Sequence, residues 1–315
     1  MRWACACATS SALLIRFFRA IGIAITPYIP DRRKEGYGPN APALLKLKEQ
    51  GASVVVTVDC GVTAYEPLAE ARKVGLDVIV IDHHQAERAL PEAVAVVDPN
   101  RVDDDSPHKQ MAAVGVAFLL AVGVNRALRA ANWYGDGKPE PDLRQWLDLV
   151  ALGTVCDVVP LTGVNRALVR QGLQALIEAE AAAALGADRH ERTAQRRGHR
   201  NGSRDRLLAT PAGDVQLRIP RFRTGSFFPS LLEPRRRVDR ALWAVVMEAY
   251  VSGVSTRKVD ELVTALGCES GISKSEVSRI CQGLDTQVQA FLNRPLEFSR
   301  YPYVYLDATY LHGRD

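Results

Sequence analysis

Three short runs of mostly β-branched residues, separated by helical patterns, constrain the fold of this chain most strongly. The runs are Ser53–Cys60, Asp77–Asp82 and Ala93–Asp98, and the spacing predicts a helix over Ala64–Val74. The unbroken apolar character of the first two runs is typical of strands buried on both faces. Strands and helices that alternate with short links predict a parallel sheet and therefore an α/β fold.

An aspartate closes each predicted strand: Asp59, Asp82 and Asp98. Ligands of open α/β sheets gather at the carboxyl ends of the strands, so we expect these side chains to converge. His83 and His84 follow Asp82 directly. Carboxylates with imidazole suit a divalent ion such as Mn²⁺, and a two-metal site activates water for phosphoester cleavage. The alternative is that the aspartates cap helices and the histidines are ordinary loop residues; the combination favours the metal.

A fourth acid, Asp157, lies between apolar residues just beyond a predicted buried helix, Leu143–Leu152. An ionised group in such surroundings needs a partner or a metal. Another buried helix is predicted over Met111–Leu128, and a loop over Trp133–Asp142. The longest apolar run, Ala112–Val124, is too short to span a bilayer, so we expect no membrane segment.

These residues carry a resemblance to the DHH phosphoesterases, which spans residues 8–176. The matching segments are IDHHQA (81–86), VTVDCG (56–61), GTVCDVVPL (153–161), PHKQMAAVGVAFLL (107–120) and EGYGPN (35–40), the last two being similar to the single-strand-specific 5′→3′ DNA exonucleases of the RecJ group.

The resemblance implies that Asp59, His83 and Asp157 are ligands of Mn²⁺ or Mg²⁺. It implies that Asp82 and His84 orient those ligands or contact phosphate. The loop 35–40 would lie near a single-stranded DNA substrate, although a plain Gly/Pro turn explains that segment equally well.

One departure from the DHH pattern concerns the family's first motif, an Asp-x-Asp cluster before a helix. The matching place reads ACACATSSALL (4–14), and no carboxylate precedes the predicted helix Ser10–Ile21. Cys5 and Cys7 could be a metal pair, but we interpret this spacing as chance. Because both metals of the family share the first motif, we predict little or no nuclease activity.

Six scattered cysteines without zinc spacing indicate free thiols in a reducing cytoplasm.

The positive charge is concentrated in the second half. Residues 1–176 hold 19 Lys and Arg against 19 Asp and Glu, whereas 177–315 hold 21 against 17. Within 189–240 there are 14 arginines, no lysine and 5 acids. Such a block is expected of a protein that binds a phosphate backbone. For Arg189–Gly202 alone, a disordered basic surface is an equally good interpretation. We expect Phe227 and Phe228 to pack a small core rather than to stack on bases.

Several elements are predicted beyond residue 178: helices at Ala179–Leu185 and Arg240–Tyr250, and a strand at Val215–Ile219. Two further helices, Thr256–Leu266 and Lys274–Leu284, flank the turn Gly267–Gly271. Ser273 and Glu276 form a capping box for the second of them. This pattern indicates a helix-turn-helix DNA reader or an ordinary helical hairpin, and spacing alone does not decide between them. The residues that we expect to contact DNA are Arg196, Arg197, Arg200, Arg204, Arg235, Arg236, Arg237, Lys274, Ser275, Ser278 and Arg279.

The same region resembles the Mutator-type transposases of bacterial insertion sequences, from about Ala179 to Asp315. The matching segments are GHRNG, PRFRTGSFFPSLLEPRRR, EAYVSGVSTRKVDELVTALG, GISKSEVSRIC and YLDATY. The resemblance implies that Asp307, after the predicted strand Tyr303–Leu306, is the first of three acids that bind two Mg²⁺ on an RNase H-like core. The other two acids are not among the 315 residues, so we expect DNA binding without complete transposition.

We therefore predict two domains: a parallel-sheet DHH domain over 1–176, then a mainly helical DNA-binding region with the first strand of an RNase H-like core over 177–315. The leading hypothesis is a DNA-binding transposase fragment fused to a defective nuclease. The alternatives are a working metal-dependent exonuclease and an unstable product with exposed apolar surface. Expected partners are insertion-sequence ends and single-stranded DNA, in the cytoplasm and without a membrane; an oligomer is possible.

Overall fold

The computed structural model describes residues 3–135, 137–210, 212–232 and 293 of the chain. The predicted helix Arg240–Tyr250, the helix-turn-helix and the last strand lie outside these residues. The same holds for eight of the candidate functional residues: Arg235, Arg236, Arg237, Lys274, Ser275, Ser278, Arg279 and Asp307.

The first half contains the predicted parallel sheet. Its strands are β1 (Val54–Val58), β2 (Asp77–Ile81) and β3 (Ala95–Val97), paired in the order β1-β2-β3. The prediction of an α/β fold is confirmed. The expectation that the first strand is buried on both faces is wrong: only β2 is largely buried, whereas Val54 at the start of β1 is exposed. The reason is that β1 and β3 are the two edges of a three-stranded sheet.

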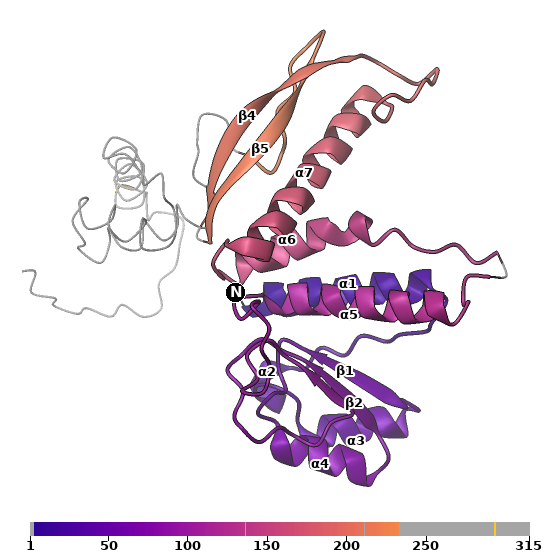
Figure 1. The fold of residues 1–315 in the computed structure, drawn as a ribbon, viewed down its shortest axis with the longest axis vertical. Coiled ribbons are helices and arrows are strands. Elements are labelled where there is room, and N and C mark those ends of the chain that lie inside the picture. Colours follow the sequence, from indigo (N-terminus) through magenta and orange to yellow (C-terminus); the bar gives the residue numbers. More distant parts are fainter. Residues whose placement is uncertain (1–2, 136, 211, 233–292, 294–315) are drawn as a thin grey trace, which may run out of the picture.

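Helices cover both faces of the sheet (Figure 1). On one face lie α3 (Ala41–Glu49) and α4 (Tyr65–Lys73), whose apolar side chains share a core with β2 and β3. On the other face lie α1 (Trp3–Ala20) and α5 (Ala113–Ala130), which contribute to a larger core with β2. A one-turn helix, α2 (Arg32–Glu35), precedes α3. The sheet is thus the middle layer of three, and its carboxyl edge remains open to carry a site.

Helix α5 is long and apolar enough, by those two criteria alone, to cross a membrane. It extends beyond the apolar run that the sequence analysis judged too short. In the structure it packs against α1 and α6 and contributes Val114, Ala117 and Ala121 to the core. Its buried Asn125 receives a hydrogen bond from the Tyr134 hydroxyl and donates to Glu140. These contacts describe a core helix of an α/β domain.

A helical layer links the sheet to the second half. The predicted helix Leu143–Leu152 is a 3-10 turn (Leu143–Trp146) followed by α6 (Leu147–Cys156). The predicted helix Ala179–Leu185 is the last part of a 23-residue helix, α7 (Gly163–Leu185). Burial of Val169, Leu173, Ile177, Ala181 and Leu185, spaced by four residues, gives α7 one continuous apolar stripe. The predicted domain boundary at residue 176 therefore falls inside one helix.

The chain then forms an antiparallel hairpin of β4 (Arg200–Thr210) and β5 (Gly213–Phe222). The strand predicted at Val215–Ile219 is confirmed within β5, whereas β4 was not predicted. Alternate residues of β5 pack with α6 and α7 in one core, which Phe227 and Phe228 join as expected. The core residues are Ala151, Leu161, Val169, Leu173, Ile177, Leu208, Ala212, Val215, Leu217, Ile219 and Leu232. Within the described residues the two halves therefore share a core.

Candidate metal centre and basic hairpin

The strand-end aspartates gather at the carboxyl edge of the sheet. The backbone N–H of Asp59, after β1, donates to the carbonyl of Ile81 at 2.9 Å, and that of Asp82, after β2, donates to Val97 at 3.1 Å. Asp59 and Asp82 are only 2% and 1% exposed, and Asp98 after β3 is equally buried. Asp98 lies close enough for the charge of Asp82 to act on it. The predicted convergence is confirmed.

His83 lies between two of the candidate carboxylates. Its Nε2 is 3.2 Å from Oδ1 of Asp59 and 3.3 Å from Oδ2 of Asp157, the residue that ends α6. These three atoms are buried and have no hydrogen-bond partner among the described residues. Such atoms each destabilise a fold by about 1–3 kcal/mol unless something satisfies them. Three of them converging on one point is the arrangement that a cation would satisfy.

His84 adds a further donor at the same place. One ligand atom each from Asp59, His83 and His84 lie within 4.8 Å of one another. The Nδ1 of His84 pairs with Oδ1 of Asp82 at 2.6 Å, and the two imidazole rings lie 4.7 Å apart. The donor set is carboxylate and imidazole, which suits Mn²⁺ or another borderline divalent ion better than it suits Ca²⁺.

The ionisation of the cluster follows from its crowding. Burial lowers the pKa of His83, but the nearby carboxylates of Asp59 and Asp157 outweigh it, so the pKa is raised overall. Burial raises the pKa of the Asp157 carboxyl. Both shifts favour the protonated forms of His83 and Asp157, and a divalent cation would bind in place of those protons.

Asp82 holds the loop that carries the histidines. Its carboxylate accepts hydrogen bonds from the backbone N–H groups of Val62 at 3.0 Å and His83 at 2.8 Å, and pairs with His84. Burial raises the pKa of Asp82, but these bonds outweigh it and the pKa is lowered overall. The side chain of Asn100 donates to the carbonyl of His83 at 2.6 Å. Asp82 and Asn100 thus position the imidazoles; the sequence analysis did not single out Asn100.

The cluster has a sulfur neighbour that the sequence analysis set aside. The thiol of Cys7, on α1, donates to Oδ2 of Asp59 at 3.1 Å. On the neighbouring helix α6, Gly153 packs against α1: a Cβ there would overlap the Thr9 hydroxyl and lie 2.7 Å from Val114. The interpretation of the Cys5–Cys7 spacing as chance stays a prediction. The described cysteines, Cys7, Cys60 and Cys156, are free thiols as predicted.

One residue of the cluster and one residue next to it have left-handed backbone conformations, which residues other than glycine rarely adopt. Asp59 has φ of 62°, and the β-branched Val158, next to Asp157, has φ of 59°. Such conformations cost about 1–3 kcal/mol each and concentrate at functional sites. Tyr37, in the segment 35–40, is 60% exposed, and partial burial together with the charge of Asp59 raises its pKa to about 12. The expectation that this loop lies near the substrate stays a prediction.

The arginines of the basic block divide into two groups. Three of the predicted DNA contacts hold the fold together: Arg196 donates to the carbonyls of Asp188 and Glu191, Arg197 to that of Ala183, and Arg200 pairs with Glu178 of α7. These bonds stabilise the end of α7 and the loop after it. For the segment 189–202 the sequence left open a stretch along a DNA backbone or a disordered basic surface; its last residues begin β4, and DNA contact stays a prediction.

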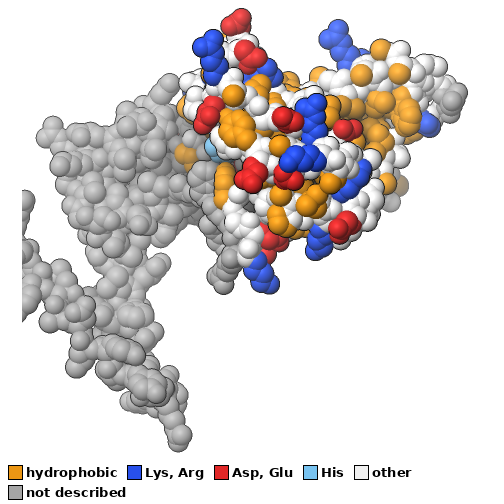
Figure 2. Space-filling model, turned by 90° about the horizontal axis from the view of Figure 1, so that it is seen from below, with side chains coloured by type: hydrophobic (Ala, Val, Ile, Leu, Met, Phe, Trp, Pro, Cys, Tyr) orange, Lys and Arg blue, Asp and Glu red, His pale blue; other side chains and the backbone are white. Residues whose placement is uncertain are grey.

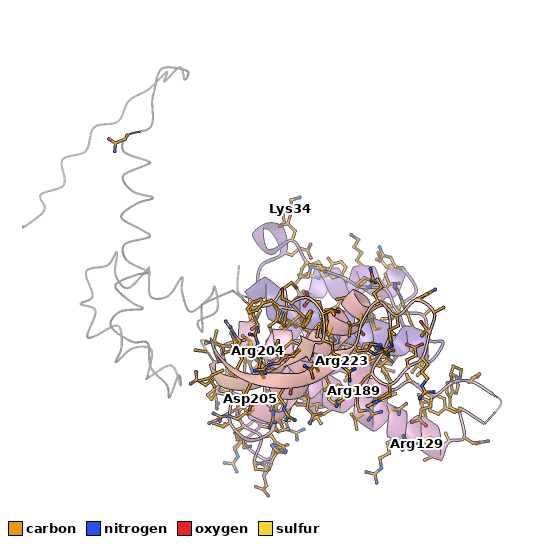
Figure 3. The ribbon with its side chains drawn as sticks, turned by 90° about the horizontal axis from the view of Figure 1, so that it is seen from above. Lys34, Arg129, Arg189, Arg204, Asp205 and Arg223 are labelled. Carbon is orange, nitrogen blue, oxygen red and sulfur yellow. The ribbon has the colours of Figure 1, made fainter. Side chains whose placement is uncertain are left out.

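Five further arginines are exposed and form no ion pair among the described residues. Arg204, in β4, is exposed near the Phe228 ring, and Arg221 and Arg223 are exposed at the end of β5. Arg189 and Arg192 are exposed in the loop between α7 and β4. Figure 3 shows Arg189, Arg204 and Arg223 from the end of the molecule that carries the hairpin. By contrast, the face below the sheet in Figure 2 has Lys and Arg interspersed with Asp and Glu.

The described fold is an α/β domain joined through one helix to a basic hairpin. The chain belongs to the Mutator family of transposases, whose family model matches residues 146–315. The family model of the DHH family N-terminal domain matches residues 6–154. The two matches overlap between 146 and 154, within and just before α6. Together they are consistent with a fusion of two families.

Known proteins match each half separately. The single-stranded-DNA-specific exonuclease RecJ of Salmonella typhimurium is 43% identical over 168 residues, which is 53% of this chain and 29% of the relative. The transposase of insertion sequence IS1081 from Mycobacterium tuberculosis is 42% identical over 151 residues, 48% of this chain and 36% of the relative. A crystal structure of an exonuclease RecJ bound to manganese has 37% identity and a TM-score of 0.46, covering 56% of this chain and 44% of that one. The chain thus spans about a third of the curated relatives that it matches.

Proposed function

We propose that this protein binds DNA through the basic hairpin and the region after it, and that its DHH domain retains a divalent-metal site with little or no nuclease activity. The observation that carries the proposal is the charge of the hairpin region. Residues 189–223 contain ten arginines and three carboxylates. Among the described residues, no carboxylate forms an ion pair with Arg189, Arg192, Arg221 or Arg223. A surface of unpaired guanidinium groups attracts phosphate.

A salt series with a fluorescent duplex tests the DNA-binding part. We expect the triple substitution Arg204→Ala, Arg221→Ala, Arg223→Ala to weaken binding and to reduce the slope of log K against log salt by about 2–3, since each lost phosphate contact changes it by ~0.9. The matched control is Arg129→Ala with Arg144→Ala, because both arginines are exposed and ion-paired in the first half. An unchanged slope in the triple variant would show that the hairpin does not contact DNA.

The proposal assigns the metal to Asp59, His83 and Asp157, with Asp82 and His84 as positioning or phosphate-contacting groups. A divalent ion held there would polarise a phosphate oxygen or a water. The sequence has no carboxylate before Asp31, so α1 brings no carboxylate to the cluster. A site without the Asp-x-Asp acids of the first DHH motif holds one ion better than two. For this reason we expect the nuclease to be defective.

The second candidate function is a working metal-dependent exonuclease on single-stranded DNA, which is what the RecJ relatives are named for. The convergence of the three orphaned ligand atoms favours it. The test is degradation of 5′-labelled single-stranded DNA with Mn²⁺, beside His83→Ala. Release of label by the parent protein but not by the variant would establish this function and overturn the proposed defect. No release from either protein, with both folded, is the expected result.

A further inference from the structure

We propose that Cys7 is a ligand of the metal, and that the site therefore prefers Zn²⁺ or another thiophilic divalent ion where a carboxylate at this position would favour Mn²⁺ or Mg²⁺. The inference rests on the proposed metal site and names the ion class that this chain's own residues select. It starts from the position of the thiol, which contacts the Asp59 carboxylate from the side of α1.

The second observation is independent of the cysteine. Asp59 is only 2% exposed, yet its Oδ1 has no hydrogen-bond partner among the described residues. This oxygen is directed at Nε2 of His83, 3.2 Å away. Oδ2 of Asp157 and Nε2 of His83 are also orphaned. Cys7 contacts the other oxygen of Asp59, so its sulfur adjoins the carboxylate that faces His83.

Three contacts link the four side chains in sequence. The sulfur of Cys7 is 3.1 Å from Oδ2 of Asp59, Oδ1 of Asp59 is 3.2 Å from Nε2 of His83, and that Nε2 is 3.3 Å from Oδ2 of Asp157. Tetrahedral zinc with bonds of about 2.0–2.3 Å separates its donors by roughly 3.4–3.6 Å. Each of these three contacts would lengthen by a few tenths of an ångström around such an ion. The set Cys7, Asp59, His83 and Asp157 contains one soft sulfur, one imidazole and two carboxylates.

The chemistry of the ligands sets the preference. A thiolate binds Zn²⁺ strongly and Mn²⁺ or Mg²⁺ weakly, because those two are harder ions that favour oxygen. On binding, the S–H bond of Cys7 breaks, the sulfur–metal bond forms, and the proton leaves to water. Two carboxylates and a thiolate together carry three negative charges, enough to neutralise a divalent ion. Cys60 differs, because its thiol donates to the backbone carbonyl of Val58 at 3.4 Å.

The experiment uses the full chain, stripped of metal, with Co²⁺ as a spectroscopic probe and with Zn²⁺ and Mn²⁺ in competition. We expect the parent to show a sulfur-to-cobalt charge-transfer band that Zn²⁺ displaces. The band should be absent in Cys7→Ser and Cys7→Asp and unchanged in the control Cys60→Ser. The ratio of Zn²⁺ to Mn²⁺ affinity should fall by about tenfold or more in Cys7→Asp relative to the parent. Circular dichroism of each metal-free variant shows that it is folded.

The outcomes separate this inference from the proposed function. Cobalt binding that lacks the sulfur band, with an unchanged Zn²⁺ to Mn²⁺ ratio in Cys7→Asp, refutes the thiolate ligand while the metal site stands. A band that is lost in Cys60→Ser and retained in Cys7→Ser also refutes it, since the sulfur would then be that of Cys60. No cobalt binding by the folded parent overturns both the inference and the metal site.

Discussion

The close contact between α6 and α7 provides a sharp test of how the two halves are joined. Gly172 of α7 packs directly on α6: a Cβ there would overlap the carbonyl oxygen of Leu147 and lie 2.7 Å from the Cβ of Ala151. Gly123 of α5 is also helical, but a Cβ there would meet nothing within 4 Å. Replacing either glycine with alanine stabilises the helix by about 0.8–1 kcal/mol through helix propensity alone. Only Gly172→Ala must also push two backbones apart.

Overpacking of this kind costs about 1–3 kcal/mol, and more where the obstacle is backbone. We therefore expect Gly123→Ala to raise the free energy of unfolding by up to ~1 kcal/mol and Gly172→Ala to lower it by about the same amount or more. For a unit of this size, 1 kcal/mol corresponds to roughly 2–4 °C in Tm. Urea unfolding followed by circular dichroism measures both variants. If Gly172→Ala were as stable as Gly123→Ala, the close packing of α7 on α6 would be refuted.

Two further predictions concern the shared core and the strand-end loop. Ile177→Ala removes a fully buried side chain from the core that joins the hairpin to α6 and α7, and should lower the free energy of unfolding by about 2–5 kcal/mol; the exposed Leu119→Ala should change it by less than ~0.5 kcal/mol. Because the pKa of Asp82 is lowered, its stabilisation is present above its ordinary value of 3.8 and is lost as the pH falls through the lower folded value. Asp82→Asn should therefore destabilise the protein by about 1.5–3 kcal/mol at pH 7 and flatten the acid side of the stability profile; an unchanged profile would contradict the assigned hydrogen bonds.

The sequence was informative about elements with a strong local signal. The β-branched runs gave β1, β2 and β3, because continuous apolar residues of this type fit a pleated sheet and the short links leave only parallel pairing. The aspartate that follows each strand was enough to predict that the site lies at the carboxyl edge. The same position, directly after a predicted strand, was enough to predict that His83 and His84 belong to the site.

The sequence was less informative where the surroundings decide. The sequence predicted only the alanine-rich end of α7. The rest of the helix is defined by burial of residues such as Val169 and Leu173 against α6 and β5. β4 was missed because its arginines hide the strand pattern, and only pairing with β5 and cover from α7 make it a strand. Arg196 and Arg197 look like DNA contacts in the sequence, but they donate to carbonyls at the end of α7, whose position no local pattern reveals.

The sequence alone determined the two families, the parallel sheet and the aspartate–histidine cluster, because these depend on residues that are close together along the chain. Tertiary structure decided what those residues can do together. The packing of α1 against the sheet places Cys7 beside Asp59, 52 positions away in the chain. Packing of β5 on α7 joins the transposase-derived hairpin to the helices of the DHH region in one core. Contacts between distant segments depend on the shape and burial of the packed elements, and a single sequence does not specify these.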